Sequence, residues 1–234
     1  MNMFRQSTVG SSARALCRAA EEGNIENIKT LLKKDGNVNE MFNGFTPFHV
    51  ACKFGKEEVV RFLLQEPNID IDILDENESR AKKIKERKGT ALHLACENDH
   101  KSVVTILLSH SKTNVNSRDN FGATPLHWSC REGHAEIVSL LLEQGGIDVN
   151  TTCSEDSTPL HYACFHNNEE CARLLLAHPE IDLRKVDEEG NTVLHDACIQ
   201  GNKGCVKVLS EHPQFLDIIN IENREQKTPC EEGK

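Results

Sequence analysis

Histidine is the residue type in this 234-residue chain whose pattern most readily suggests chemistry. Five histidines occur in similar short segments, each three residues before a cysteine, and both residue types are common zinc ligands. They are His49, His93, His127, His161 and His195. Taken alone, this set suggests a metal site.

The spacing of these segments argues against a metal site. Similar segments open every 34 residues, at Thr90, Thr124, Thr158 and Thr192. Further copies open at Thr46, one period plus ten residues before Thr90, and at Thr228, 36 residues after Thr192. Equivalent positions on stacked helices lie about 8 to 10 Å apart, whereas ligands of one zinc lie near 2 Å from the metal. The column of histidines therefore cannot chelate, and no metal or other cofactor is expected.

Each segment has the features of a helix start. Copies such as Thr124-Pro125-Leu126-His127 begin with a threonine whose hydroxyl can cap the first turn, and a following proline costs no hydrogen bond there. The first helix should end at a left-handed residue, supplied by Gly55, Asp99, Gly133, Asn167 and Gly201. The second helix then carries a wide apolar stripe, as in residues 137–142. The repeat unit is thus helix–turn–helix.

This pattern resembles the ankyrin repeat, whose Thr-Pro-Leu-His, glycine and Val-Val-x-Leu-Leu-Leu features occur here in order over residues 13–230. The resemblance implies an all-α ankyrin-repeat solenoid with β-hairpin-like loop tips. It also implies that the histidine bonds loop backbone between repeats. The first copy is degenerate, with Arg14, Ala15 and Cys17 in place of Thr, Pro and His, as expected of an end cap.

The register predicts one repeat domain over residues 13–234 after a flexible N-terminal segment, 1–12. The repeats span about 13–40, 41–84, 85–118, 119–152, 153–186 and 187–222, followed by a partial copy, 223–234. An insertion at 74–87 interrupts the second. The abrupt seventh copy is either a minimal cap or the beginning of a longer protein.

Composition limits the compartment and the partner. The net charge of −10 argues against nucleic acid, because binding to phosphates needs an excess of Lys and Arg. No apolar run is long enough to cross a bilayer, so no membrane insertion is expected. Most of the ten cysteines share repeat positions and are expected in the core, with Cys153 alone at a loop tip. We therefore expect a monomer in the reducing cytoplasm, and also in the nucleus.

No phosphate-binding glycine loop, HExxH or nucleophile signature occurs, which predicts a protein without enzymatic activity. Trp128 and Tyr162 are single residues of their kind, but they share a repeat position with Val50 and Leu94. Packing between helix layers is therefore expected for them rather than ligand binding.

Exposed positions that vary between copies are the candidates for partner binding. A repeat stack of this type presents loop tips and the outer ends of first helices on one concave side. There the sequence places the aromatic residues Phe45, Phe54, Phe121 and Phe165, with Arg131 and His166 beside them. Such rings are typical of binding hot spots, although they could instead fold onto adjacent repeats.

Two charged features adjoin these positions. Glu155, Asp156, Glu188 and Glu189 lie in consecutive tips, an acidic edge that could attract a basic segment or simply be solvated. The insertion is basic, with Arg80, Lys82, Lys83, Lys85, Arg87 and Lys88. It is either a finger toward an acidic partner, a weak nuclear-import signal or a solvated loop.

Three asparagines suggest a modification through the family resemblance alone. Asn39, Asn116 and Asn150 each follow a valine, similar to ankyrin asparagines modified by the oxygen-sensing asparaginyl hydroxylase. The same positions also fit the structural consensus of the repeat.

The sequence as a whole favours a non-catalytic module, a scaffold or adaptor, that binds a protein partner. The alternative is the targeting domain of a larger enzyme or channel that continues beyond Lys234. Which partner is bound does not follow from the residues.

Overall fold

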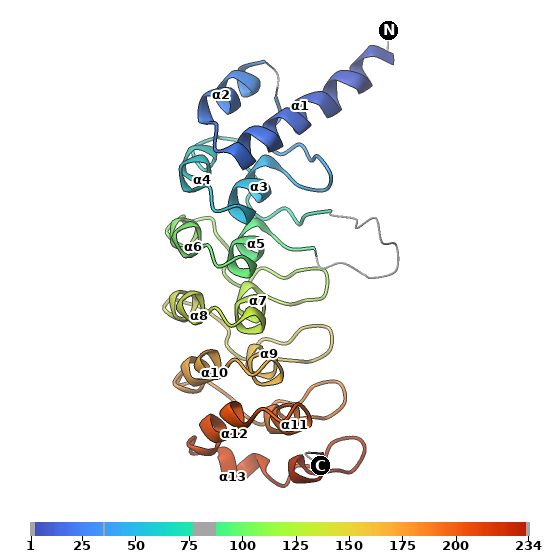
Figure 1. Ribbon diagram of the computed structural model, residues 1–234, viewed down its shortest axis with the longest axis vertical. Helices are drawn as coiled ribbons and strands as arrows, with labels where there is room; N and C mark the ends of the chain where they lie inside the picture. Colours follow the sequence, from blue (N-terminus) through green and yellow to red (C-terminus); the bar gives the residue numbers. More distant parts are fainter. Residues whose placement is uncertain (1–2, 35, 77–87, 233–234) are drawn as a thin grey trace. The chain divides into compact units, whose positions relative to one another are not determined.

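The computed structural model describes residues 3–34, 36–76 and 88–232, and this part of the chain is helical (Figure 1). Isolated extended pairs occur at two loop tips, between Phe42 and Phe45 and between Val186 and Thr192. The chain divides into two compact units, residues 1–120 and 121–234. The expected all-α fold with hairpin-like tips is confirmed.

The first unit stacks its helices in two layers (Figure 1). One layer holds the first helices of successive repeats: α1 (Met3–Glu22), α3 (Pro47–Lys53) and α5 (Ala91–Glu97). The other holds the second helices: α2 (Ile25–Lys33), α4 (Glu57–Leu63) and α6 (Lys101–Leu108).

The second unit has the same two-layer arrangement. Its first helices are α7 (Pro125–Glu132), α9 (Pro159–Phe165) and α11 (Val193–Ile199), followed by the short α14 (Pro229–Glu232), which packs on α11. Its second helices are α8 (Ala135–Leu142), α10 (Glu169–Leu176) and α12 (Lys203–Ser210), followed by α13 (Phe215–Ile218).

A reciprocal cap starts each full first helix. The Thr46 hydroxyl accepts the backbone N–H of His49 at 3.2 Å, and the His49 ring nitrogen Nδ1 accepts the backbone N–H of Thr46 at 3.2 Å. The same box occurs at the starts of α5, α7, α9 and α11. Histidine here takes the part that glutamate or glutamine has in the common capping box.

Left-handed residues end the first helices, as predicted. Gly133 has φ of +81°, and Asp99 and Asn167 each have φ of +57°. The residue that follows the left-handed position can then bond the end of the first helix in the previous repeat. The Asn168 amide donates to the carbonyls of Cys130 and Arg131, both at 2.8 Å.

The core of each unit lies between its layers and is mostly aliphatic. In the first unit it includes Leu16, Ile28 and Leu63, and in the second Leu141 and Leu175, all buried. Trp128 and Tyr162 are also buried, so their expected packing role is confirmed. Among the described residues, no helix is long and apolar enough to span a membrane.

Two parts of the fold differ from the expectation. Helix α1 begins at Met3, so residues 3–12 are helical where a flexible segment was predicted. No proline or repeat boundary interrupts this stretch, and the helix formed by the first copy continues through it. Helix α13 was not predicted, because it lies in the last repeat, whose period of 36 residues exceeds the regular 34. Most of the basic insertion, including Arg80, Lys82, Lys83, Lys85 and Arg87, lies outside the described residues.

Candidate functional site

The recurring histidines bind the next repeat. The Nε2 atom of His49 lies 2.9 Å from the Ile73 carbonyl oxygen, and equivalent contacts join His127 to Ser157, His161 to Asn191 and His195 to Lys227 at 3.0 to 3.2 Å. A carbonyl oxygen only accepts, so Nε2 carries the proton. The predicted structural role of the histidines is confirmed.

Burial keeps the His49 and His161 rings neutral. It lowers the pKa of His49 and His161 to about 4, since a charged imidazole is poorly solvated between the layers. Within the described residues, no three His, Cys, Asp or Glu side chains converge in a way that would hold a metal ion.

Most cysteines are buried core residues. Burial raises the pKa of the Cys17 thiol to about 11 and raises that of Cys52 further above its ordinary value. The prediction that Cys153 is exposed was wrong. Its side chain is buried, and its sulfur accepts a hydrogen bond from the Tyr162 hydroxyl at 3.8 Å. Cys230 is the exposed cysteine among the described residues.

Backbone hydrogen bonds tie successive loop tips together. In the first unit the Glu76 N–H donates to the Gly44 carbonyl at 2.8 Å. In the second unit the donors are Ser154, Glu188 and Arg224, and the acceptors are the carbonyls of Phe121, Glu155 and Glu189, at 2.7 to 2.9 Å. The tips of the second unit therefore form one continuous edge.

Apolar side chains are exposed beside these tips, at the ends of the first helices. Phe54, Phe165 and Ile199 are 44%, 46% and 44% exposed. The backbone beneath two of them is fixed, because the His100 ring bonds the Lys53 carbonyl at 2.8 Å and the Asn202 amide donates to the Phe165 carbonyl at 2.9 Å. The rings are thus presented on rigid backbone.

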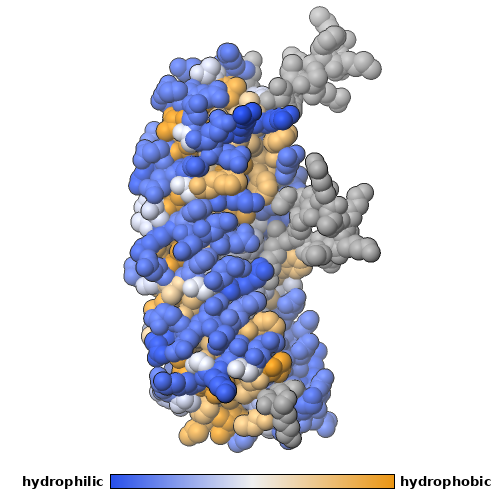
Figure 2. Space-filling view, viewed as in Figure 1, coloured by the Kyte–Doolittle hydropathy of each residue, from blue (hydrophilic) through white to orange (hydrophobic). Residues whose placement is uncertain are grey.

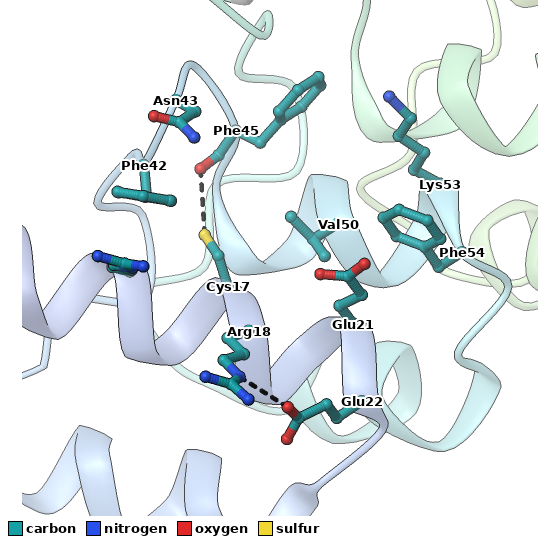
Figure 3. Close-up of a pocket in the computed structure, with 11 residues that line it drawn as sticks. Cys17, Arg18, Glu21, Glu22, Phe42, Asn43, Phe45, Val50, Lys53 and Phe54 are labelled. Atoms are coloured by element: carbon teal, nitrogen blue, oxygen red, sulfur yellow. Dashed lines mark hydrogen bonds and ion pairs between the residues drawn. The ribbon is translucent and has the colours of Figure 1, made fainter.

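In the first unit, α1, α3 and the tip at 42–45 enclose a hollow of about 700 Å³ (Figure 3). Glu21, Val50 and Phe54 face it from the two helices, and Phe42 and Phe45 line it from the tip. The Cys17 thiol donates to the Phe45 carbonyl at 3.3 Å and so holds the tip against α1.

Cations cover two of the aromatic rings in this hollow. Lys53 Nζ lies 4.8 Å from the centre of the Phe45 ring, and the Arg14 guanidinium carbon lies 5.8 Å from that of Phe42. Phe45 is accordingly half-buried, whereas Phe54 keeps a free face. The hollow can accept an apolar side chain with polar groups around it.

In the second unit, a hollow of about 510 Å³ lies between the last two tips and α11. Ile199 lines it from α11. The tips contribute three acidic residues and two basic ones: Glu188, Glu189, Glu225, Arg224 and Lys227. The structure thus brings two of the four predicted acidic residues to one cavity. Glu155 and Asp156 are exposed in the preceding tip and do not line it.

The remaining predicted contact residues are near these positions. His166 is exposed and packs edge-on against Phe165, with ring centres 5.2 Å apart. Arg131 is half-buried and lies 3.4 Å from the Glu132 carboxylate, and Phe121 is half-buried in its tip. Their role in binding stays a prediction.

The asparagines considered for hydroxylation have structural partners. The Asn39 amide donates to the Asn68 carbonyl at 2.6 Å and accepts the Asp70 N–H at 3.0 Å. Asn150 makes the same pair of bonds to the next repeat, through Glu180 and Asp182. An enzyme would have to draw the side chain out of both bonds, and hydroxylation of Asn39, Asn116 and Asn150 stays a prediction.

Sequence reasoning missed one residue near the second hollow. Asp196 occupies the slot that Val50, Leu94, Trp128 and Tyr162 fill in other repeats, and it is 7% exposed. Burial, together with the charges of Asp187 and Glu189, raises the pKa of its carboxyl to about 8. In the sequence it could be recognised as the single carboxylate at a repeat position that is apolar in the other copies.

The described face seen in Figure 2 is mainly polar. Figure 2 shows that hydrophilic residues cover most of the described surface in that view, with apolar residues in separate patches. This is the setting in which a few exposed apolar side chains can act as anchors.

Comparison with solved structures supports the fold. The crystal structure of the ankyrin repeat domain of Bcl-3, described as a unique member of the IkappaB protein family, has a TM-score of 0.74. The match covers 94% of this chain and 93% of that one, at 24% sequence identity. At this identity the likeness shows the fold alone.

Curated relatives match a smaller part of the chain. The human transient receptor potential cation channel subfamily A member 1 is 32% identical over 91 residues, and its Caenorhabditis elegans homolog is 31% identical over 90. Each match covers 38% of this chain but only 7% and 6% of those proteins.

The family model described as "Ankyrin repeats (3 copies)" matches residues 3–75, 73–153 and 146–220. These ranges include all five threonine–histidine caps and the left-handed turns that follow them. The chain belongs to the ankyrin-repeat family, whose domains are protein-interaction modules.

Proposed function

We propose that this chain is a non-catalytic adaptor that binds a protein partner on the face formed by its loop tips and first helices. The observation that carries the proposal is the exposure of Phe54, Phe165 and Ile199 at the ends of first helices. Large apolar side chains within a polar rim are typical anchors of protein interfaces.

The rigidity of the face supports the same proposal. Hydrogen bonds between tips and from Asn168, Asn202 and His100 fix the backbone around the anchors before any partner arrives. A partner therefore pays little for ordering this surface, which favours affinity. The acidic tips around Glu188 and Glu189 favour a partner with a basic segment.

The test is an affinity purification that compares the wild-type chain with Phe54→Ala/Phe165→Ala. Proteins retained by the wild type should be lost with the double variant, and direct titration of one such partner should show a Kd at least about tenfold weaker. The melting temperature should stay nearly unchanged, because both rings are exposed.

Leu216→Ala is the matched control, since Leu216 is an equally apolar side chain, 73% exposed on α13 and away from the face. It should retain every partner. If the double variant and this control retain the same proteins with equal affinity, the proposed binding face is wrong. A large loss of stability in the double variant would show that the rings belong to the core.

The channel relatives favour a second candidate function, in which the repeats form the targeting arm of a larger protein. This chain spans only 7% and 6% of the lengths of those relatives. An antibody against the repeats should then detect, in cells, a product much larger than 26.2 kDa. A product of about that mass would exclude this candidate and leave the adaptor.

A further inference from the structure

The hollow of the first unit contains a lysine that contacts an aromatic ring but pairs with no carboxylate of the described chain. Lys53 Nζ lies 4.8 Å from the centre of the Phe45 ring, and among the described residues Lys53 forms no ion pair. Its side chain is half-buried at the end of α3, directly before the exposed Phe54, and both line the hollow (Figure 3). A positive charge and an apolar ring are thus presented from adjacent residues.

Another lysine of the same unit shows that contact with a ring leaves room for a carboxylate. Lys29 Nζ lies 5.7 Å from the centre of the Phe62 ring and 2.7 Å from the Glu26 carboxylate. The ring occupies one side of the ammonium group, and its hydrogens remain available, since lysine has three to donate. Lys53 has the first of these two contacts, so a carboxylate from a partner can supply the second.

The other charged residues of the hollow leave this positive charge uncompensated. Arg18 and Glu22 pair with each other at 2.8 Å. Arg14 and Glu21 lie seven residues apart on α1, about 10 Å along the helix axis, and neither forms an ion pair within the described chain. The lining therefore carries an excess of one positive charge, in a chain whose net charge is −10.

The walls of the hollow are held before any partner arrives. The Cys17 thiol bonds the Phe45 carbonyl at 3.3 Å, and the His100 ring bonds the Lys53 carbonyl at 2.8 Å. The Phe45 ring also limits where the Lys53 amine can move, so pairing costs less side-chain entropy than at an isolated surface lysine. Such a preformed site favours affinity.

We propose that this hollow binds a partner segment in which a large apolar residue stands next to Asp or Glu. The apolar side chain packs on the free face of Phe54, and the carboxylate pairs with Lys53. The volume of about 700 Å³ lies within the range of about 300 to 1,000 Å³ that is usual for ligand pockets. This inference rests on the proposed binding face and names the chemistry that its first-unit part recognises. A basic segment at the acidic tips is compatible with it, because those tips belong to the second unit.

The experiment is a selection of phage-displayed random peptides on the wild-type chain and, in parallel, on Phe54→Ala. Peptides recovered on the wild type alone should carry Asp or Glu next to a large apolar residue. They are then titrated as synthetic peptides with amidated C-termini, so that any carboxylate belongs to a side chain. Replacing the acid by its amide should weaken binding at least about threefold, and replacing the apolar residue by alanine at least about tenfold.

Lys53→Met and Lys29→Met form a matched pair of variants, because both remove a lysine charge from above a ring. Lys53→Met should weaken binding of the acidic peptide at least about threefold and should abolish the difference between this peptide and its amide. Lys53→Arg should retain that difference. Lys29→Met, which removes a lysine already paired with Glu26, should leave both affinities unchanged.

The outcomes separate this inference from the proposed function. Selected peptides without an acidic residue, or an acid-to-amide loss of equal size on the wild type and Lys53→Met, would overturn the carboxylate site. If such peptides still lose affinity on Phe54→Ala, the binding face itself stands. A selection that yields no peptide dependent on Phe54 would also overturn this inference, while the affinity purification with Phe54→Ala/Phe165→Ala decides the proposed function separately.

Discussion

Single residues at equivalent repeat positions carry either structure or recognition in this chain. His49 and its counterparts join one repeat to the next, and their burial lowers the pKa of His49 and His161. Asp196 departs from the apolar column to which it belongs, and burial together with the charges of Asp187 and Glu189 raises the pKa of its carboxyl. A buried carboxyl of this kind costs stability when it is charged.

This reading predicts that Asp196→Asn stabilises the fold, and does so more at high pH. The pKa of the carboxyl is raised from 3.8 to about 8 in the folded state. Between these values the folded chain holds a proton that the unfolded chain lacks, so the wild type loses stability as pH rises through that range. The asparagine side chain does not titrate, so it adds no such pH dependence to the free energy of unfolding.

Urea unfolding at pH 5 and pH 8.5 would measure this. The stability advantage of Asp196→Asn should grow between the two by more than about 1.4 kcal/mol, the equivalent of one pKa unit. Asp217→Asn, the same change at an exposed side chain of α13, is the matched control. Parallel profiles for Asp196→Asn and the wild type would show that Asp196 is not a buried, strained carboxyl.

Residue roles were predictable from the sequence where the repeat supplied many copies. The histidine role was implied by the family resemblance, which five matching positions supported, whereas the burial of Cys153 depends on its contact with Tyr162 and has no counterpart in other copies. Asp196 was visible as an exception. The raised pKa of its carboxyl could not be predicted, because the repeat pattern does not show that Asp187 and Glu189 lie close to it in space.

At the scale of elements, the turn after each first helix sets where the binding anchors point. Gly133 ends α7 in the left-handed region, with φ of +81°. A side-chain carbon there would lie 2.7 Å from the Asn168 amide oxygen, the side chain that bonds the end of α7. A side chain at Gly133 would therefore both strain the backbone and disturb the hydrogen bond from Asn168 to the end of α7.

Gly133→Ala should therefore destabilise the chain by about 1 to 2 kcal/mol. Gly145→Ala is the control, because Gly145 lies in an exposed turn and an added carbon would meet nothing within 4 Å. It should change stability by less than about 0.5 kcal/mol. Equal effects of the two substitutions in thermal or urea unfolding would contradict the role assigned to this turn.

Helix positions followed from the 34-residue period, and the exceptions lie where the period does not apply. Helix α13 occupies a stretch lengthened by two residues, and the helical segment from Met3 precedes the first copy. Periodicity compares copies with one another, so it carries no information on segments that occur once.

At the scale of the whole molecule, the chain consists of two compact units that each present tips and first-helix ends on one face. The family identity accounts for that arrangement but leaves the partner open, since one scaffold serves many partners. A basic partner is part of the proposal, in keeping with the net charge of −10.

Hydrogen–deuterium exchange of the chain, free and bound to a partner recovered by affinity purification, tests the central claim most directly. Binding should slow exchange in residues 42–54, 154–166 and 187–200, which form tips and first helices. It should leave the second helices α4, α8 and α10 unchanged. Slower exchange confined to those second helices, with none at the tips and first helices, would contradict the account.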